Sequence, residues 1–457
     1  MIPMRLAEIA AVVDGEVHGP AGAAEVVVSG PAFHDSRAPE PAGLYVAVVG
    51  ERVDGHDFAA GAHAVLGSRP TDGPTVVVAD PVRALGRLAR HVVAALPARV
   101  SALTGSAGKT STKDLLAQVL AADGPTVATR ANANNELGVP LTALRADPAT
   151  RHLVVEMGAR GGGHLAYLCD LVPPTVSAVL NVGTAHIGEF GSREGIARAK
   201  GELVEALPAE GTAVLNADDP LVSAMAARTR ARVLTFGEHA DVRWRGVSLD
   251  DRGHPRFELG HDGVWAPVAL QVTGWHQVPN AGAAAAVALA RGLALDTVAA
   301  GLSAAVADSR WRMELHDLPS GTLLVNDAYN ASPDSVIAAL STLADLGRRR
   351  GGRAVAVLGV MLELGEEHVP GHTRVGTAAG ELGLDAVVVI GDDAAALAAG
   401  ARAAGVGEVI VTASREDAAA WVRENAGGLD VVLVKASRGA ALERVVEQLL
   451  EGDAPAS

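Results

Sequence analysis

The segment LTGSAGKTSTK, residues 103–113, combines glycine, lysine and hydroxyl residues at the spacing of a short phosphate-binding loop. An apolar run typical of a strand precedes it, and a helical pattern follows it. Glycines let backbone N–H groups turn toward phosphate oxygens, and the N-terminus of the following helix adds partial positive charge. In such a loop Lys109 contacts the β- and γ-phosphates, and the hydroxyl of Thr110 is a ligand for Mg²⁺. The pattern predicts a nucleotide site over Gly105, Ser106, Ala107, Gly108, Lys109, Thr110 and Ser111.

Two further side chains could complete a magnesium site. Glu156 ends the apolar run HLVVEMG, and a carboxylate at a strand end suits Mg²⁺ because this ion prefers hard oxygen ligands. His186 lies in NVGTAHIGEFGS, soon after another expected strand. The alternatives stay open at this point: Glu156 could face water, and His186 could be a hydrogen-bonded structural residue.

Lysine is rare in this chain, since only four of the 38 basic residues are lysines: Lys109, Lys113, Lys200 and Lys435. Lys200 falls in the expected helix REGIARAKGELVEAL, where the residues three and four positions away are all apolar. Burial lowers the pKa of a lysine, and the neutral amine can add CO₂ to become a carbamate, an oxygen ligand that arginine cannot provide. Lys113, one turn after Lys109, is predicted to lie on a solvated helix face.

Alternating strand and helix patterns organise the rest of the chain. From about Arg99 apolar runs alternate with helical stretches, and a second such series follows Trp311. This alternation predicts an α/β fold of βαβ units with parallel sheets, and ligands of such sheets bind at the carboxyl ends of the strands. The expected strand ends carry Lys109, Thr110, Glu156, His186, Asp218, Asp327 and Lys435.

The segment VNDAYNASPDS, residues 325–335, places polar groups between an expected strand and a helix capped near Ser332. SRWRMEL just ahead of it supplies Arg310 and Arg312. An arginine delivered from a neighbouring domain can stabilise a transferring γ-phosphoryl group. The alternative is a domain linker with solvated arginines.

Composition excludes several classes of protein. The formal net charge of −15 argues against a general nucleic-acid binder, which would carry a basic face. Cys169 is the single cysteine, so no internal disulfide is possible. The N-terminus lacks a signal-peptide pattern, and the longest small-apolar run stops at Arg291, too short for a bilayer. We therefore expect a cytoplasmic protein without membrane insertion.

The order of motifs resembles the Mur ligases, the ATP-dependent amide-forming enzymes of peptidoglycan synthesis, over essentially the whole chain. HDSR with GERVDGHDF resembles the N-terminal uridine-nucleotide domain of this family, and TGSAGKTSTK its shortened phosphate loop. NANNELGVPLTAL, EMGARGGGHL, NVGTAHIGEFGS, ARAKGE, LNADDP and VLVKASRG follow in family order. NDAYNASPDS favours the branch that joins D-alanyl-D-alanine to UDP-N-acetylmuramoyl-tripeptide.

The resemblance implies three domains: a mixed α/β uridine-nucleotide domain at 1–97, a central P-loop ATPase-like parallel-sheet domain at 98–310, and a Rossmann-like ligase domain at 311–457. It implies ATP and Mg²⁺ as cofactors, an acyl-phosphate intermediate, and UDP-N-acetylmuramoyl-tripeptide and D-alanyl-D-alanine as substrates. We also expect a monomer.

The resemblance assigns roles to individual positions. Those expected to take part in catalysis are Lys109, Glu156, His186, Lys200 and Arg312. ATP would contact the loop from Gly105 to Ser111 together with Asn280, Arg312 and Asp327, and Mg²⁺ would be held by Thr110, Glu156, His186 and a carbamylated Lys200. Substrate contacts are expected from Asp35, Ser36, Arg37, Asn134, Asn135, Tyr329, Asn330, Lys435, Ser437 and Arg438.

Three positions depart from the family pattern: Gln277 where asparagine is usual, Val360 where an acid is frequent, and Gly43 where an acidic residue is usual. Two alternatives also remain. A Mur-ligase paralogue of specialised metabolism, adding a different amine or amino acid, would keep every motif named above. A nucleotide-dependent switch or binding protein would bind ATP without forming an amide, and would leave Lys200 without a purpose.

Overall fold

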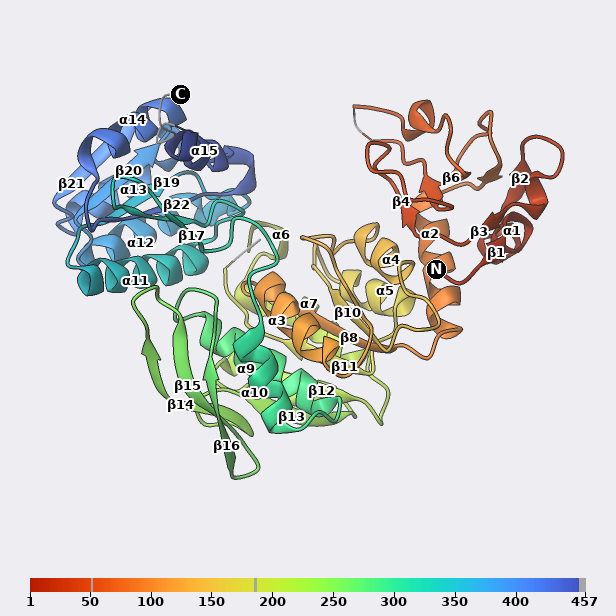
Figure 1. Ribbon diagram of the computed structural model, residues 1–457, viewed down its shortest axis with the longest axis horizontal. Helices are drawn as coiled ribbons and strands as arrows, with labels where there is room; N and C mark the ends of the chain where they lie inside the picture. Colours follow the sequence, from red (N-terminus) through yellow and green to blue (C-terminus); the bar gives the residue numbers. More distant parts are fainter. Residues whose placement is uncertain (51, 185–186, 452–457) are drawn as a thin grey trace.

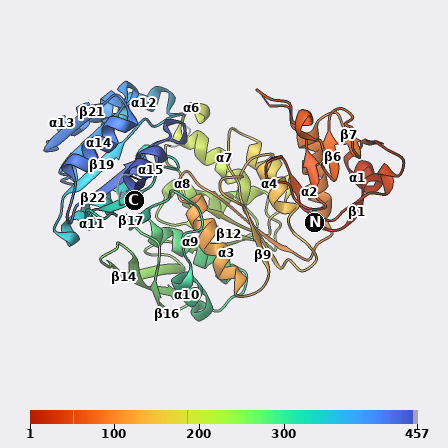
Figure 2. The ribbon, with the colours of Figure 1, turned by 45° about the horizontal axis from the view of Figure 1, so that its top comes forward.

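The computed structural model describes residues 1–50, 52–184 and 187–451, which form three α/β domains in chain order (Figure 1). The N-terminal and C-terminal domains lie on either side of the central domain, as both views show (Figures 1 and 2). Each domain has its own main sheet, so three separate sheets must be docked to bring distant segments together.

The N-terminal domain is a five-stranded mixed sheet in the order β2-β7-β6-β5-β4, with β1 and β3 paired separately. Helix α2 begins after Asp80, whose carboxylate accepts the N–H groups of Val82 and Arg83, and Pro81 occupies the first turn. The elements are β1 (Met4–Arg5), α1 (Leu6–Val13), β2 (Glu16–His18), η1 (Ala23–Glu25), β3 (Val27–Val28), β4 (Ala32–Phe33), β5 (Leu44–Val46), η2 (Gly55–Phe58), β6 (Ala64–Gly67), β7 (Thr75–Val77) and α2 (Pro81–Ala94).

The central domain is a nine-stranded sheet in the order β16-β15-β14-β13-β12-β11-β8-β10-β9. Helices α3, α9 and α10 bury apolar side chains against one face, and α4, α5 and α7 cover the other. The elements are β8 (Arg99–Thr104), α3 (Lys109–Ala121), β9 (Thr126–Ala128), α4 (Gly138–Ala143), β10 (His152–Glu156), α5 (His164–Leu171), β11 (Val176–Val179), α6 (Ile187–Phe190), α7 (Arg193–Glu205), β12 (Thr212–Asn216), α8 (Pro220–Ser223), η3 (Ala224–Arg228), β13 (Arg232–Phe236), β14 (Val242–Leu249), β15 (Pro255–His261), β16 (Val264–Ala269), α9 (Gln277–Ala290) and α10 (Leu295–Ala304).

The C-terminal domain is a six-stranded sheet in the order β17-β18-β22-β19-β20-β21, parallel except for β17. Helices α11, α12 and α13 pack on one face, and α14 and α15 on the other. The elements are β17 (Glu314–Asp317), β18 (Leu323–Asn326), α11 (Pro333–Arg350), β19 (Ala354–Leu358), η4 (Gly365–Glu367), α12 (His368–Glu381), β20 (Ala386–Ile390), η5 (Asp392–Ala394), α13 (Ala395–Ala403), β21 (Glu408–Thr412), α14 (Arg415–Asn425), β22 (Val431–Lys435), η6 (Arg438–Ala440) and α15 (Glu443–Glu451).

The predicted parallel sheets are confirmed in both larger domains. In the central sheet β8 lies between β10 and β11, so Glu156 stands beside Leu103 and Val179 beside Thr104. The carboxyl ends of three strands therefore meet at one edge, which places the ends of β10 and β11 next to the phosphate loop. The antiparallel extension from β14 to β16 was not predicted from the sequence. No helix in the described part of the chain is long and apolar enough to cross a bilayer.

Candidate active site

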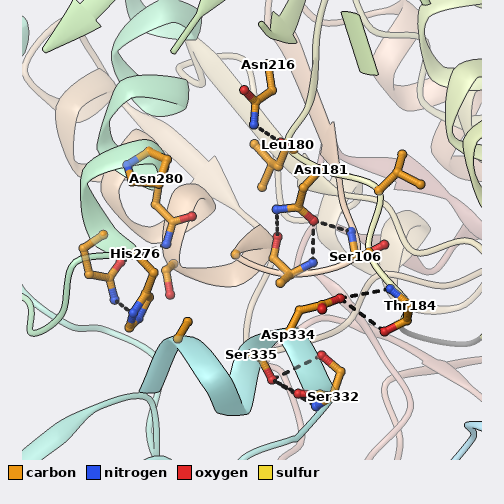
Figure 3. Close-up of a pocket in the computed structure, with 18 of the residues that line it drawn as sticks. Ser106, Leu180, Asn181, Thr184, Asn216, His276, Asn280, Ser332, Asp334 and Ser335 are labelled. Atoms are coloured by element: carbon orange, nitrogen blue, oxygen red, sulfur yellow. Dashed lines mark hydrogen bonds between the residues drawn. The ribbon is translucent and has the colours of Figure 1, made fainter. Parts of the chain in front are cut away.

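The predicted phosphate loop connects β8 to α3 and is shaped by two asparagines from outside it. Gly108 has a φ of +79°, a conformation that favours glycine, and a Cβ there would lie 2.3 Å from Asn280 Oδ1. Asn181 accepts the N–H groups of Ser106 and Ala107 through its Oδ1, both at 2.9 Å (Figure 3). The loop therefore begins α3 at Lys109 with backbone geometry that no larger residue at position 108 could adopt without strain.

A buried hydrogen-bond chain starts from the hydroxyl of Thr110. Thr110 Oγ1 donates to Glu156 Oε2 at 2.9 Å, and Asn134 Nδ2 donates to Glu156 Oε1 at 2.7 Å. From the other side of the site, Arg312 Nη2 donates to Thr110 Oγ1 at 2.9 Å. The arginine comes from the segment that leads into the C-terminal domain, so this chain joins the phosphate loop to an element about two hundred residues away, a separation of 202 positions.

Burial destabilises the charged forms of two lysines of the site. Burial lowers the pKa of Lys109, and its ammonium donates to the carbonyl of Gly105 at 2.6 Å. Burial also lowers the pKa of Lys200 well below its ordinary value, and the charge of Lys109 lowers it further. Lys200 is 6% exposed and lines the same cavity as Thr110 and Glu156. The prediction that Lys200 lies on an apolar helix face is confirmed, because Ile196, Ala197, Leu203 and Val204 are all buried.

The donor set fits a magnesium ion that also binds phosphate. Mg²⁺ in such sites uses one or two carboxylates with substrate phosphates and water, rather than a cage of protein ligands. Glu156 and Thr110 supply a buried carboxylate and a hydroxyl that already contact each other. Among residues 1–50, 52–184 and 187–451 no cluster of three or more His, Cys, Asp or Glu side chains could hold an ion alone. His186 lies outside the described residues.

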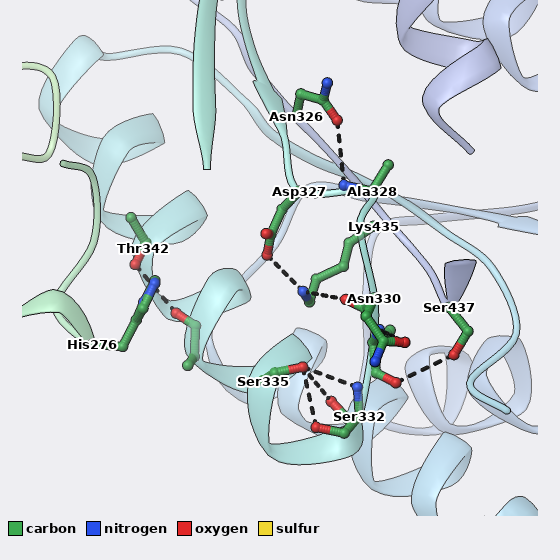
Figure 4. A network of polar contacts seen from close by, with 12 residues as sticks. His276, Asn326, Asp327, Ala328, Asn330, Ser332, Ser335, Thr342, Lys435 and Ser437 are labelled. Carbon is green, nitrogen blue, oxygen red and sulfur yellow. Dashed lines mark hydrogen bonds and ion pairs between the residues drawn. The ribbon is translucent and has the colours of Figure 1, made fainter. Parts of the chain in front are cut away.

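The C-terminal domain contributes a second polar network at the end of β18 and β22 (Figure 4). Lys435 Nζ donates to Asp327 Oδ2 at 2.6 Å and to the carbonyl of Asn330 at 2.9 Å. Ser437 Oγ accepts the N–H of Leu362 at 2.9 Å and donates to the carbonyl of Ala331 at 3.3 Å. The predicted segment around Asp327 thus forms one wall of the site, held by a buried ammonium group.

Two cavities meet at this wall, of about 510 Å³ and 410 Å³. The first contains Asn280 and Asp327, and the second contains Glu156, Lys200 and Tyr329. The residues that line both are Ser106, Ala107, Gly108, Arg312, Ser332, Ser335 and Lys435. The two cavities therefore adjoin at the phosphate loop, Arg312 and Lys435. The second also contains Asn134, Asn135, Asn330, Ser437 and Arg438.

The central and C-terminal domains touch directly across the first cavity (Figure 3). Asp334, in the first turn of α11, accepts the N–H of Thr184 at 3.1 Å and its hydroxyl at 3.2 Å. Arg374 Nη2 donates to the same carboxylate at 2.8 Å. This contact and the Arg312 contact therefore tie the C-terminal domain to the central domain at two places around the cavity.

The predicted uridine-site residues lie elsewhere. In the N-terminal domain the carboxylate of Asp35 accepts two hydrogen bonds from the guanidinium of Arg37, at 2.9 Å and 2.8 Å, and these lower the pKa of Asp35. Asp35, Ser36 and Arg37 line neither of the two cavities. Their assignment to a uridine nucleotide stays a prediction.

Two of the three departures from the family pattern have local physical reasons, and nothing in the structure explains Val360. Gln277 Oε1 accepts Asn280 Nδ2 at 3.0 Å, so the unusual glutamine orients the asparagine that contacts Gly108. A Cβ at Gly43 would lie 2.5 Å from the carbonyl oxygen of Pro31, which leaves no room for an acidic side chain. Beside Gln277, burial lowers the pKa of His276 to about 4.

The prediction for Lys113 was wrong, and Asn181 was missed. Lys113 is 2% exposed and forms an ion pair with the buried carboxylate of Asp114, because α9, α10 and the sheet cover α3 where a solvated face was expected. Asn181 carried a usable signal, since it is the first polar residue after the apolar end of VSAVL, which contains β11 beside the strand that leads into the phosphate loop.

Comparisons with known proteins agree with this geometry. The profile of the Mur ligase middle domain matches residues 103–288, and that of the Mur ligase glutamate ligase domain matches residues 311–438. The chain belongs to the Mur ligase family. It is 43% identical over 504 aligned residues to the UDP-N-acetylmuramoyl-tripeptide–D-alanyl-D-alanine ligase of Mycobacterium tuberculosis, with 99% of each chain covered. It is 37% identical to the ligase of the same name from Escherichia coli, again with 99% of each covered.

Solved structures resemble this Mur ligase over nearly its full length. A crystal structure of MurF from Acinetobacter baumannii has a TM-score of 0.86 at 30% identity and covers 98% of this chain and 99% of its own. MurF ligase from Thermotoga maritima in complex with ADP has a TM-score of 0.80 at 30% identity, with 92% of this chain and 97% of its own covered.

Proposed function

We propose that this Mur ligase joins D-alanyl-D-alanine to UDP-N-acetylmuramoyl-tripeptide with ATP, in the synthesis of peptidoglycan precursors. One observation carries the proposal: Arg312, from the start of the C-terminal domain, reaches Thr110 of the phosphate loop inside a cavity that also contains Glu156 and Lys200. An arginine, a phosphate loop and a buried carboxylate around one space suit phosphoryl transfer to an acceptor held in the adjoining pocket. The two relatives named above carry this activity in their names.

In the first step the carboxylate of the tripeptide attacks the γ-phosphorus of ATP. A bond forms between the carboxylate oxygen and phosphorus, the bond to the bridging oxygen of ADP breaks, and an acyl phosphate results. Backbone N–H groups of the loop, Lys109 and Arg312 hold the negative charge of the transferring group. Because Arg312 Nε is buried and makes no hydrogen bond within the described chain, the arginine keeps a donor for a phosphate oxygen.

In the second step the amine of the dipeptide attacks the acyl carbon. The new N–C bond replaces the C–O bond to phosphate, the nitrogen loses a proton, and inorganic phosphate leaves. We assign Tyr329, Asn330, Ser437 and Arg438 to the pocket that admits the amine. Catalysis depends mainly on holding both reactants in line and excluding water, which the meeting of two domains achieves.

Thr110 and Glu156 would hold one Mg²⁺, and Glu156, His186 and a carbamylated Lys200 a second, which would neutralise phosphate charge when bound. Burial lowers the pKa of Lys200 and so favours its neutral amine, and only the neutral amine can add CO₂. The carbamate would convert a buried cation into an anionic oxygen donor.

We further assign the uridine nucleotide to the N-terminal domain, with Asp35, Ser36 and Arg37 near it, and Asn134 and Asn135 to the peptidyl part. We place the domain boundaries near residues 98 and 311, and we propose a cytoplasmic monomer.

The test measures phosphate release from ATP and Mg²⁺ with UDP-N-acetylmuramoyl-tripeptide, with and without D-alanyl-D-alanine. Release that depends on the dipeptide, with a product of the summed mass minus water, supports the proposal. Phosphate release at the same rate without the dipeptide would contradict the proposal. A different amine that outcompetes D-alanyl-D-alanine would indicate a paralogue of specialised metabolism.

A further inference from the structure

One face of the phosphate-loop helix α3 carries three polar side chains spaced by four residues. These are Thr110, Asp114 and Gln118, which the helical repeat places in one row along the helix. Thr110 stands at the phosphate loop, and Gln118 stands two turns away from it. The row runs beneath the segment from Ala305 to Trp311, which connects α10 to the C-terminal domain.

The members of the row hold Val306 and Ser309 of that connecting segment and Arg312, which directly follows it. Gln118 makes a paired contact with Val306: its Oε1 accepts the N–H at 3.0 Å, and its Nε2 donates to the carbonyl at 2.9 Å. Asp114 Oδ2 accepts the N–H of Ser309 at 3.2 Å. Thr110 Oγ1 accepts Arg312 Nη2 at 2.9 Å.

The connecting segment therefore runs antiparallel to the helix. From Gln118 to Thr110 the helix advances about 12 Å at 1.5 Å per residue, and the segment covers this length between Val306 and Arg312. The segment thus arrives at the phosphate loop because it is fastened along the helix that the loop begins.

The hydrogen bonds from α3 to the backbone of the segment end at Ser309, and Arg312 is held through its side chain. Trp311 and Met313 have φ values of +60° and +54°, in the left-handed region that costs a non-glycine residue free energy. Tyr329 N donates to the carbonyl of Trp311 at 3.2 Å, and Met313 is buried in the core of the C-terminal domain. Arg312 is therefore presented from a short strained stretch, held on one side by α3 and on the other by the C-terminal domain.

We infer that Gln118 and Asp114 are positioning residues for the ligase reaction, which act through Arg312 by fixing the path of the interdomain connection along α3. The inference rests on the proposed function. It also explains the buried Lys113, whose ammonium pairs with Asp114 and orients that carboxylate toward Ser309. Neither residue belongs to the phosphate loop itself, so we expect their substitution to change turnover and not nucleotide affinity.

The test compares Gln118→Ala with Gln271→Ala. Gln271 Nε2 donates to the carbonyl of Ser303 at 2.8 Å, so the control also removes a glutamine-to-backbone bond, but one that holds the last turn of α10 and not the connecting segment itself. Alanine suits the helix at position 118, so folding is preserved. For Gln118→Ala we expect kcat to fall about three- to tenfold with KM for ATP and ADP affinity unchanged, and the amides of Val306 and Ser309 to exchange hydrogen faster.

A second comparison tests whether the effect passes through Arg312. In an Arg312→Lys background, Gln118→Ala should cause no further loss of kcat, because the group it positions is already altered. Equal kcat in Gln118→Ala and wild type, an equal loss in Gln271→Ala, or full additivity with Arg312→Lys would each overturn the inference. A wild-type enzyme without dipeptide-dependent phosphate release would instead remove the proposed function, and the inference with it.

Discussion

The substitution Gly108→Ala probes how tightly the phosphate loop is built. Gly108 has a φ of +79°, and the new methyl group would lie 2.3 Å from Asn280 Oδ1. Under 3 Å something must move, and the Asn280 amide is the group that can. It would lose the 3.0 Å hydrogen bond to Gln277, which holds it in place.

Both parts of the penalty can be estimated. The left-handed backbone costs an alanine about 1–2 kcal/mol relative to glycine. The lost hydrogen bond between Asn280 and Gln277 costs about 1 kcal/mol. The loop can relax away from its phosphate-binding shape when no nucleotide is present, so the penalty falls on binding. We expect ADP affinity to fall by about 2–3 kcal/mol, which is roughly 30- to 150-fold in Kd.

Isothermal titration with ADP and Mg²⁺ measures this directly. Gly292→Ala is the matched control, because Gly292 also has a positive φ, +92°, but has no atom within 4 Å of the added methyl group and follows the helix that carries Asn280. It should lower the free energy of unfolding and leave ADP affinity unchanged. In an Asn280→Ala background the clash is absent, so Gly108→Ala should cost only the backbone share.

Wild-type ADP affinity in Gly108→Ala would refute this reasoning, since the loop would then tolerate a Cβ where the structure leaves none. An unchanged penalty in the Asn280→Ala background would refute the part assigned to the clash.

Three further predictions follow from buried titratable groups. Lys200→Ala should abolish turnover, Lys200→Arg should stay inactive, and short carboxylic acids or bicarbonate should partly restore Lys200→Ala, as measured by phosphate release. His276 has a pKa of about 4 in the fold against about 6.5 unfolded, so the unfolded state binds more protons between these values and stability falls as pH falls through this window. The free energy of unfolding should drop by about 2 kcal/mol from pH 6.5 to 5, and His276→Gln should remove that drop. Lys435→Met should cost about 3–5 kcal/mol because it leaves the carboxylate of Asp327 unpaired, and adding Asp327→Asn should recover most of the stability but not the activity.

Each of these has a clear contrary outcome. Full turnover in Lys200→Arg would exclude the carbamate. The same pH dependence in His276→Gln and wild type would mean that another group titrates. Urea unfolding of the Lys435 and Asp327 variants that showed simple additivity would mean that the two side chains do not depend on each other.

Sequence patterns within a few residues were enough to predict the phosphate loop and the apolar surroundings of Lys200. Glycine spacing between a strand and a helix indicates a phosphate loop, and helical spacing placed Lys200 among apolar neighbours, because both patterns are written within a few residues. The same reasoning failed for Lys113, since its burial depends on α9 and α10, which come more than 160 residues later in the chain. The antiparallel strands β14 to β16 were missed because half of their side chains face solvent and give no continuous apolar run.

The sequence by itself therefore determined the nucleotide loop, the alternation of strands and helices, the family, and the residue types available for chemistry. Only the tertiary structure decided which of them meet. Arg312 reaches Thr110 across 202 positions, Asn181 holds Ser106 and Ala107 from just beyond the neighbouring strand β11, and α3 holds the connection to the next domain. Turn chemistry and helical periodicity act over a few residues, whereas these contacts depend on the order of strands in a sheet and on the docking of two domains.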